Sequence, residues 1–81
     1  MNREDIFNTV TEIFRDIFDN KSLVLADHTT ADDVEEWDSL AHIGIITAIQ
    51  EEFSIEFSME SVFEMKNVGE LVDAIMALHN G

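Results

Sequence analysis

Apolar residues recur near the start of the chain at the spacing of one helical face. Within residues 2–19 they are Ile6, Phe7, Val10, Ile13, Phe14, Ile17 and Phe18. An i, i+4, i+7, i+11 series keeps side chains on one side of an α-helix. The pattern therefore predicts a long amphipathic helix over residues 2–19.

Between residues 20 and 38 the periodicity fades and turn-forming residues gather. A small apolar run, Leu23 to Leu25, interrupts them, and Val34 follows. A connection this long is uncommon in a small domain and is often functional. We predict a long loop that Leu23, Leu25 and Val34 hold against the core.

A second helix is predicted from Ser39, with Asp38 as its N-cap, to Phe53 or Ser54. Its expected core face consists of Leu40, Ile43, Ile46, Ile49 and Phe53. The alternating residues 53–57 taken alone indicate a β-strand. We discount that strand, because a single strand has no partner in a helical domain.

Two more helices are predicted towards the end of the chain. Ser58 is expected to cap a short helix that contains Val62, Phe63 and Met65. Asn67 followed three residues later by Glu70 is a capping-box variant and predicts a final helix. The expected core face of that helix consists of Val68, Leu71, Val72, Ile75 and Met76.

These elements predict an all-α fold, a compact bundle of three long helices and one short helix with a long loop between the first two. A length of 81 residues allows one domain, so residues 1–81 are interpreted as a single domain. The absence of proline and the three glycines disfavour an all-β fold. The expected core consists of Ile6, Phe7, Val10, Phe14, Leu40, Ile43, Ile46, Ile49, Phe63, Leu71, Val72 and Ile75.

Charge restricts the possible partners. Four Lys and Arg against eighteen Asp and Glu give a formal net charge of −14. Nucleic acid and anionic membrane surfaces would repel such a chain, so we expect protein partners with basic patches. The acidic candidates for steering them are Glu35, Glu36, Asp38, Glu51, Glu52, Glu56 and Glu60. No signal peptide or membrane span is recognisable, so a cytoplasmic monomer is expected.

The sequence offers little for catalysis or metal binding. There is no cysteine, which excludes a thiol nucleophile and thiolate ligands. His28, His42 and His79 lack metal-ligand spacing, so no metal site is expected and the histidines are assigned surface or pH-sensitive roles. Asp38, Ser39 and His42 do not make a hydrolytic triad, because a triad needs its acid behind the base. Trp37 is interpreted as a partly buried lid over the loop.

Ser39 is the strongest candidate site. It lies at the start of a predicted helix, where backbone N–H groups lack intrahelical partners and the helix dipole favours negative charge. A phosphodiester on its hydroxyl would be stabilised there. The alternative, from local chemistry alone, is an ordinary serine at a helix start.

Asp38-Ser39-Leu40, followed by Ile43, Ile46, Ala48-Ile49 and Glu51-Glu52-Phe53, resembles the signature of acyl carrier proteins. The resemblance implies a four-helix bundle in which Ser39, flanked by Asp38 and Leu40, carries a phosphopantetheine arm. A magnesium-dependent phosphopantetheinyl transferase installs such an arm from coenzyme A, and its thiol holds an acyl group as a thioester. The imported thiol agrees with the absence of cysteine. The carrier itself would be non-catalytic.

The resemblance also implies a partner surface and a cargo. Carriers of fatty-acid synthases usually have acidic residues after the serine, where this chain has Ala41, His42 and Gly44. We therefore expect docking through these residues to dedicated acyl-transferring or synthase enzymes, in fatty-acid-like or specialised acyl or polyketide biosynthesis. Trp37-Asp38-Ser39 differs from the Gly-Gly-His-Ser of many peptidyl carriers.

A peptidyl or aminoacyl carrier and an unmodified acidic interaction module remain as alternatives. In the family, acyl chains can shelter between the helices. The residues at which we expect such a cavity in this chain are Ile43, Ile46, Phe63 and Ile75.

Overall fold

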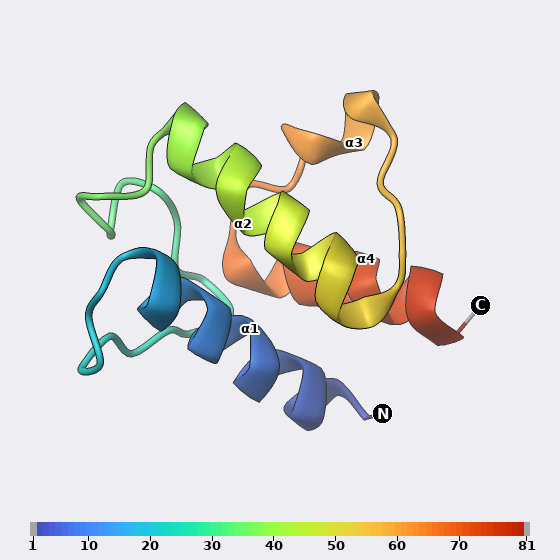
Figure 1. The fold of residues 1–81 in the computed structure, drawn as a ribbon, viewed down its shortest axis with the longest axis horizontal. Coiled ribbons are helices and arrows are strands. Elements are labelled where there is room, and N and C mark those ends of the chain that lie inside the picture. The colour runs from blue at the N-terminus through green and yellow to red at the C-terminus, as the bar shows by residue number, and fades with distance from the viewer. Residues whose placement is uncertain (1, 81) are drawn as a thin grey trace.

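The computed structural model describes residues 2–80, and four helices follow one another along them (Figure 1). Helix α1 spans Arg3–Ile17, α2 spans Ser39–Phe53, α3 spans Met59–Val62 and α4 spans Val68–Asn80. The first, second and fourth have 15, 15 and 13 residues, whereas α3 has 4. The predicted bundle of three long helices and one short helix, with a long loop between α1 and α2, is confirmed.

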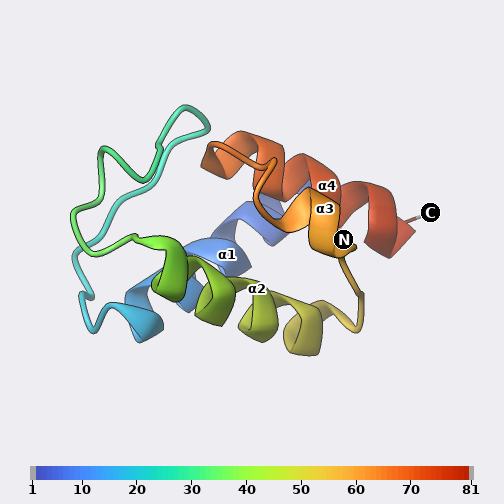
Figure 2. The ribbon, with the colours of Figure 1, turned by 90° about the horizontal axis from the view of Figure 1, so that it is seen from above.

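The helices enclose one core. Helix α1 packs against both α2 and α4. Figures 1 and 2 show α3 on the side of the bundle opposite α1, and the loop between α1 and α2 at the end of the bundle where α2 begins. The side chains that are most completely buried come from α1, α2 and α4: Phe14, Ile6, Ile45, Ile49, Leu71, Ile75, Val10, Val68 and Val72.

Capping residues set the helix ends. Asn2 Oδ1 accepts a hydrogen bond from the Asp5 N–H at 2.8 Å, so α1 begins at Arg3 instead of at residue 2. Ser54 ends α2 in the left-handed conformation, with φ of 55°. Ser58 caps α3 as predicted, but this helix ends at Val62, so Phe63 and Met65 lie in the connection to α4 and not in the helix.

The long loop is fastened to the core and to α4. Leu25 and Val34 are buried and Leu23 packs against the core, in agreement with the predicted anchors, and Trp37 is buried as well. Backbone N–H groups at the start of α4 donate to the loop, from Val68 to the Thr29 carbonyl at 2.9 Å and from Gly69 to the Asp27 carbonyl at 2.8 Å.

Hydrogen bonds at residues 67–70 also start α4. Asn67 Oδ1 accepts from the Glu70 N–H, while the Glu70 carboxylate accepts from the Lys66 N–H, a variant of the capping box. The region 53–57 forms no strand. Within residues 2–80 the β pairing consists of an isolated bridge between Thr30 and Asn67.

The predicted core face of α2 is wrong at two positions. Leu40 is 82% exposed and Ile43 is 41% exposed. The residues that α2 buries are His42, Ile45, Ile46, Ile49 and Phe53. Apolar side chains lie on nearly every side of this helix, so more than one face satisfies the helical period, and packing against α1 determines which face is buried. Phe63, also expected in the core, is 56% exposed.

Candidate functional site

Ser39 is the first residue of α2, and its side chain is exposed. Asp38 fixes this helix start: its Oδ1 accepts from the Ala41 N–H at 2.8 Å, and its carbonyl accepts from the His42 N–H at 2.9 Å. The hydroxyl of Ser39 therefore lies at the positive end of the helix dipole, and the first turn of α2 contains no acidic residue. This position suits an anionic group bonded to the serine oxygen.

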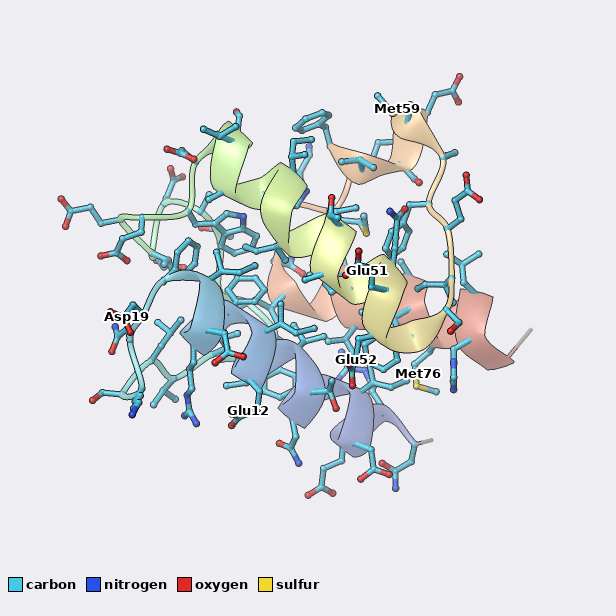
Figure 3. All side chains as sticks on the ribbon, viewed as in Figure 1. Glu12, Asp19, Glu51, Glu52, Met59 and Met76 are labelled. Carbon is cyan, nitrogen blue, oxygen red and sulfur yellow. The ribbon has the colours of Figure 1, made fainter. Side chains whose placement is uncertain are left out.

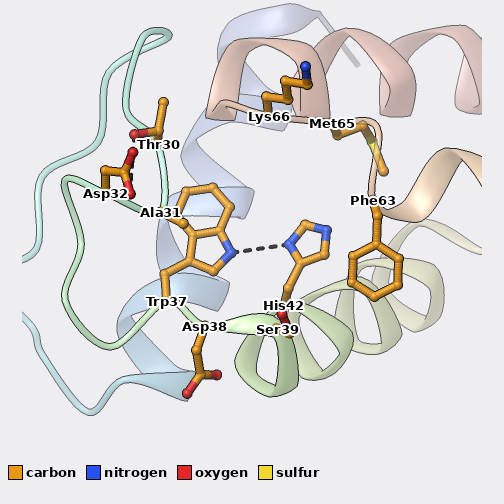
Figure 4. A pocket seen from close by; sticks show the side chains of 10 residues that line it. All are labelled: Thr30, Ala31, Asp32, Trp37, Asp38, Ser39, His42, Phe63, Met65 and Lys66. Carbon is orange, nitrogen blue, oxygen red and sulfur yellow. Dashed lines mark hydrogen bonds between the residues drawn. The ribbon is translucent and has the colours of Figure 1, made fainter.

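A pocket opens beside Ser39 (Figure 4). Its volume is about 580 Å³, within the range of about 300–1,000 Å³ that is usual for small-molecule sites. Three segments contribute to it: the long loop, the start of α2 and the connection between α3 and α4. The lining residues are Thr30, Ala31, Asp32, Trp37, Asp38, Ser39, His42, Phe63, Met65 and Lys66.

Trp37 and His42 form the inner wall of this pocket. Trp37 Nε1–H donates to His42 Nδ1 at 3.1 Å, and His42 Nε2 lies 2.6 Å from the Val62 carbonyl oxygen. The indole N–H is only a donor and the carbonyl is only an acceptor, so the two bonds select the neutral ring with its proton on Nε2. Through His42 the long loop, α2 and the end of α3 are joined at one point.

The surroundings of this pair are aromatic. The Trp37 ring meets Phe14 of α1 edge to face, with centroids 5.0 Å apart, and His42 lies between Trp37 and Phe63. Trp37 is 5% exposed and His42 is 7% exposed. Trp37 is thus more deeply buried than a partly covered lid.

The burial of His42 corrects two sequence-based assignments, a surface role and a place on the docking surface. Both ring nitrogens are already hydrogen-bonded to Trp37 and Val62, so the ring is not available as a base for Ser39.

The other residues assigned to partner docking lie at the surface. Ala41 is half-buried, and those that are exposed are Glu35, Glu36, Gly44, Glu51, Glu52, Glu56 and Glu60. Glu51 and Glu52 lie at the end of α2 remote from Ser39 (Figure 3). Acidic side chains therefore flank α2 at both ends, and Ser39–Gln50 contains no Asp, Glu, Lys or Arg.

Sequence reasoning missed the exposure of Leu40 and Ile43 on α2. We call Leu40, Ile43, Gly44 and Thr47 the neutral stripe; all four are exposed and follow one another at helical spacing. Leu40 and Ile43 had been assigned to the core. A signal was present in the sequence, because a face through Ile45, Ile46, Ile49 and Phe53 also satisfies the helical period.

The four residues expected to line an acyl cavity are not gathered in the pocket beside Ser39. Ile46 and Ile75 are 4% and 0% exposed, whereas Ile43 and Phe63 are at the surface. Of the four, Phe63 alone lines that pocket. Over the part of the chain that the structure describes, no three His, Cys, Asp or Glu side chains gather to hold a metal ion. No helix among those residues has the length and apolar character needed to cross a membrane.

Comparisons with known proteins agree with this geometry. The model of the family described as "Phosphopantetheine attachment site" matches residues 8–75. The fold is similar to the solution NMR structure of a holo acyl carrier protein from Geobacter metallireducens, with 36% sequence identity and a TM-score of 0.84. That similarity covers 90% of this chain and 84% of the other. No curated protein matches the sequence.

Proposed function

The chain belongs to the phosphopantetheine attachment-site family and has the fold of an acyl carrier protein, and from this premise we propose that Ser39 is the residue that carries the prosthetic group. One observation carries the proposal: Ser39 has an exposed hydroxyl at the first residue of α2, and a pocket opens beside it that a group attached to Ser39 can reach. When bound, phosphopantetheine supplies a thiol that holds an acyl group as a thioester.

The residues around Ser39 fit the phosphodiester end of that group. Asp38 accepts hydrogen bonds from the Ala41 and His42 N–H groups. These bonds hold the helix start in place and leave the Ser39 hydroxyl at the surface. A negative charge at a helix N-terminus is stabilised by about 0.3–1 kcal/mol. The residues of this chain thus position and stabilise the attachment point, and the chemistry of acyl transfer belongs to the partner enzymes.

We further propose that these enzymes recognise α2 through two kinds of interaction. The acidic residues at its ends steer basic surfaces at long range, while the neutral stripe makes the close contact. An acyl-transferring or synthase enzyme with an apolar strip flanked by Lys and Arg fits this arrangement. An enzyme surface that binds a helix with acidic residues throughout would differ from such a strip. This difference favours a specialised acyl pathway with dedicated enzymes. A cytoplasmic monomer remains our expectation.

Intact mass spectrometry tests the attachment site. The protein is incubated with coenzyme A, Mg²⁺ and a broad-specificity phosphopantetheinyl transferase, beside the variants Ser39→Ala and Ser58→Ala. Ser58 is a matched control, because it is also an exposed serine at a helix N-terminus. We expect one phosphopantetheine on the parent protein and on Ser58→Ala, and none on Ser39→Ala.

Far-UV circular dichroism confirms that each variant is folded. If folded parent protein gains no mass while a known carrier in the same tube is modified, an unmodified acidic interaction module becomes the better account.

A further inference from the structure

A hydrogen bond between two buried side chains spans Ser39 (Figure 4). Trp37 lies two residues before Ser39 and His42 lies three residues after it. The indole N–H of Trp37 donates to His42 Nδ1 at 3.1 Å, so the two side chains are joined across the segment that contains the exposed serine. We propose that His42 is a positioning residue for the transfer of phosphopantetheine: by holding Trp37 it fixes the place of the Ser39 hydroxyl. The inference rests on the proposed role of Ser39.

Helix capping alone holds only one side of this segment. Asp38 accepts from the Ala41 and His42 N–H groups, and these bonds fix Asp38 relative to the first turn of α2. They do not reach the residues before Asp38. The bond between the side chains of Trp37 and His42 supplies that restraint, because it ties the residue before the cap to the same helical turn. The Trp37 backbone N–H in turn donates to the Val34 carbonyl at 3.0 Å, which connects the restraint to the long loop.

Both members of the pair are anchored to the rest of the bundle. His42 Nε2 lies 2.6 Å from the Val62 carbonyl oxygen at the end of α3. The Trp37 indole packs edge to face against Phe14 of α1, with ring centroids 5.0 Å apart. Figures 1 and 2 show α1 and α3 on opposite sides of the bundle. The segment around Ser39 is therefore held from both sides, and its arrangement is set before any enzyme binds.

The transfer depends on where the hydroxyl lies. Ser39 Oγ forms a bond to the phosphorus that bears pantetheine in coenzyme A, the bond from that phosphorus to the bridging oxygen breaks, and the adenosine bisphosphate half leaves with that oxygen. The hydroxyl proton passes to a base of the transferase, because both ring nitrogens of His42 are already hydrogen-bonded. An enzyme that needs the hydroxyl in one place binds only the carriers that present it there, and its apparent affinity falls with their fraction. Loss of one hydrogen bond shifts such an equilibrium by about 2- to 12-fold.

Kinetics of modification with three variants test this role. Trp37→Phe removes the indole N–H and keeps an aromatic ring beside Phe14. His42→Gln keeps a donor for the Val62 carbonyl but has no acceptor at the place of Nδ1. His42→Asn keeps an acceptor at the place of Nδ1 and loses the donor for Val62. The two His42 variants are therefore matched controls for each other, because each preserves one of the two hydrogen bonds.

Initial rates are measured by intact mass at saturating coenzyme A. We expect Trp37→Phe and His42→Gln each to raise KM for the carrier by about 2- to 12-fold, with kcat unchanged. The double variant should raise KM no further than either change alone, because both remove the same bond. His42→Asn should keep the KM of the parent although its Tm falls with the loss of the Val62 bond. Trp37 is 5% exposed and His42 is 7% exposed, so a higher KM reports the place of Ser39 and not a lost contact with the enzyme.

The other outcomes separate two kinds of failure. Absence of mass gain on folded parent protein overturns the role of Ser39 and the inference with it. Mass gain with the same KM for the parent, Trp37→Phe and His42→Gln overturns the inference alone. An equal rise in KM for His42→Asn and His42→Gln also overturns it, because lost stability and not the Trp37 bond then sets the rate. A fall confined to kcat overturns it as well, because the effect then lies in the bound complex. Far-UV circular dichroism verifies that each variant is folded, and if His42→Gln is not, Trp37→Phe decides by the same criteria.

Discussion

The fold does not require glycine at position 44. It lies in the middle of α2, where glycine is less favourable than alanine by about 0.8–1.0 kcal/mol. A Cβ built at this position meets no heavy atom within 4 Å, and neither Gly44 nor Gly69 has a positive φ. We therefore expect Gly44→Ala to raise the free energy of unfolding by about 0.8–1.0 kcal/mol, with Tm higher by about 4–8 °C in a domain of this size.

Gly69→Ala is the matched control, because Gly69 is also a helical glycine. A Cβ there would lie 3.0 Å from the Asp27 carbonyl oxygen and 3.1 Å from the Asp27 Cβ. The Gly69 N–H holds that same carbonyl at 2.8 Å, so the loop would have to move. Overpacking costs about 1–3 kcal/mol, which exceeds the gain in helix propensity. We expect Tm to fall, in contrast to Gly44→Ala.

Because Gly44 has no Cβ and is exposed, it leaves room for a docked enzyme to approach α2 closely, and the proposed docking to α2 would use this space. Gly44→Ala should therefore lower kcat/KM for modification by the phosphopantetheinyl transferase while Tm rises. Thermal unfolding followed by far-UV circular dichroism and initial rates of modification measure the two effects. An unchanged or lower Tm would refute the propensity argument. A higher Tm with unchanged kcat/KM would refute the role of Gly44 in docking to that enzyme.

Three further perturbations test the inner wall of the pocket beside Ser39, the net charge of the chain and the acidic residues at the end of α2. His42→Leu leaves the Trp37 indole N–H and the Val62 carbonyl without their partner, so urea unfolding should show a loss of about 1–3 kcal/mol for each group; a loss below that range would mean that water replaces the ring. Adding NaCl to about 1 M, where the Debye length is about 3 Å, should raise Tm by screening the net charge of −14, and a constant Tm would contradict self-repulsion. The double variant Glu51→Lys, Glu52→Lys should slow association with the transferase at low salt and match the parent at high salt; equal rates at low salt would remove both residues from the steering surface.

Local chemistry explains why the sequence was sufficient to place the helices and to put Ser39 at a helix start. Asp38, Ser58 and Asn67 each accept a hydrogen bond from an N–H group three residues further on, an interaction that depends on a few neighbouring residues. The position of Ser39 at a helix start follows from the same short-range rule. Burial of Leu25 and Val34 was likewise predictable, because apolar residues are few in this polar loop.

Long-range packing explains what the sequence did not reveal. Leu40 and Ile43 fit a helical stripe as well as Ile45 does, and only tertiary packing, including that against α1, selects the face that includes Ile45. The bond between Trp37 and His42 joins a loop residue to a helix residue, so no periodic pattern marks it. The carbonyl of Val62 is a backbone group, and its position depends on how α3 packs against α2.

The exposure of Leu40 and Ile43 has a consequence for the docking of partner enzymes to α2 that we propose. In a chain with net charge −14, charge is confined to the two ends of this surface and its centre is neutral. Charge at the rim of an interface acts mainly on the association rate, whereas apolar contacts at the centre act mainly on dissociation. Added salt should therefore slow the encounter with an enzyme while the lifetime of the complex changes little. Such a division suits a carrier that must meet several enzymes quickly and remain with each only long enough for transfer.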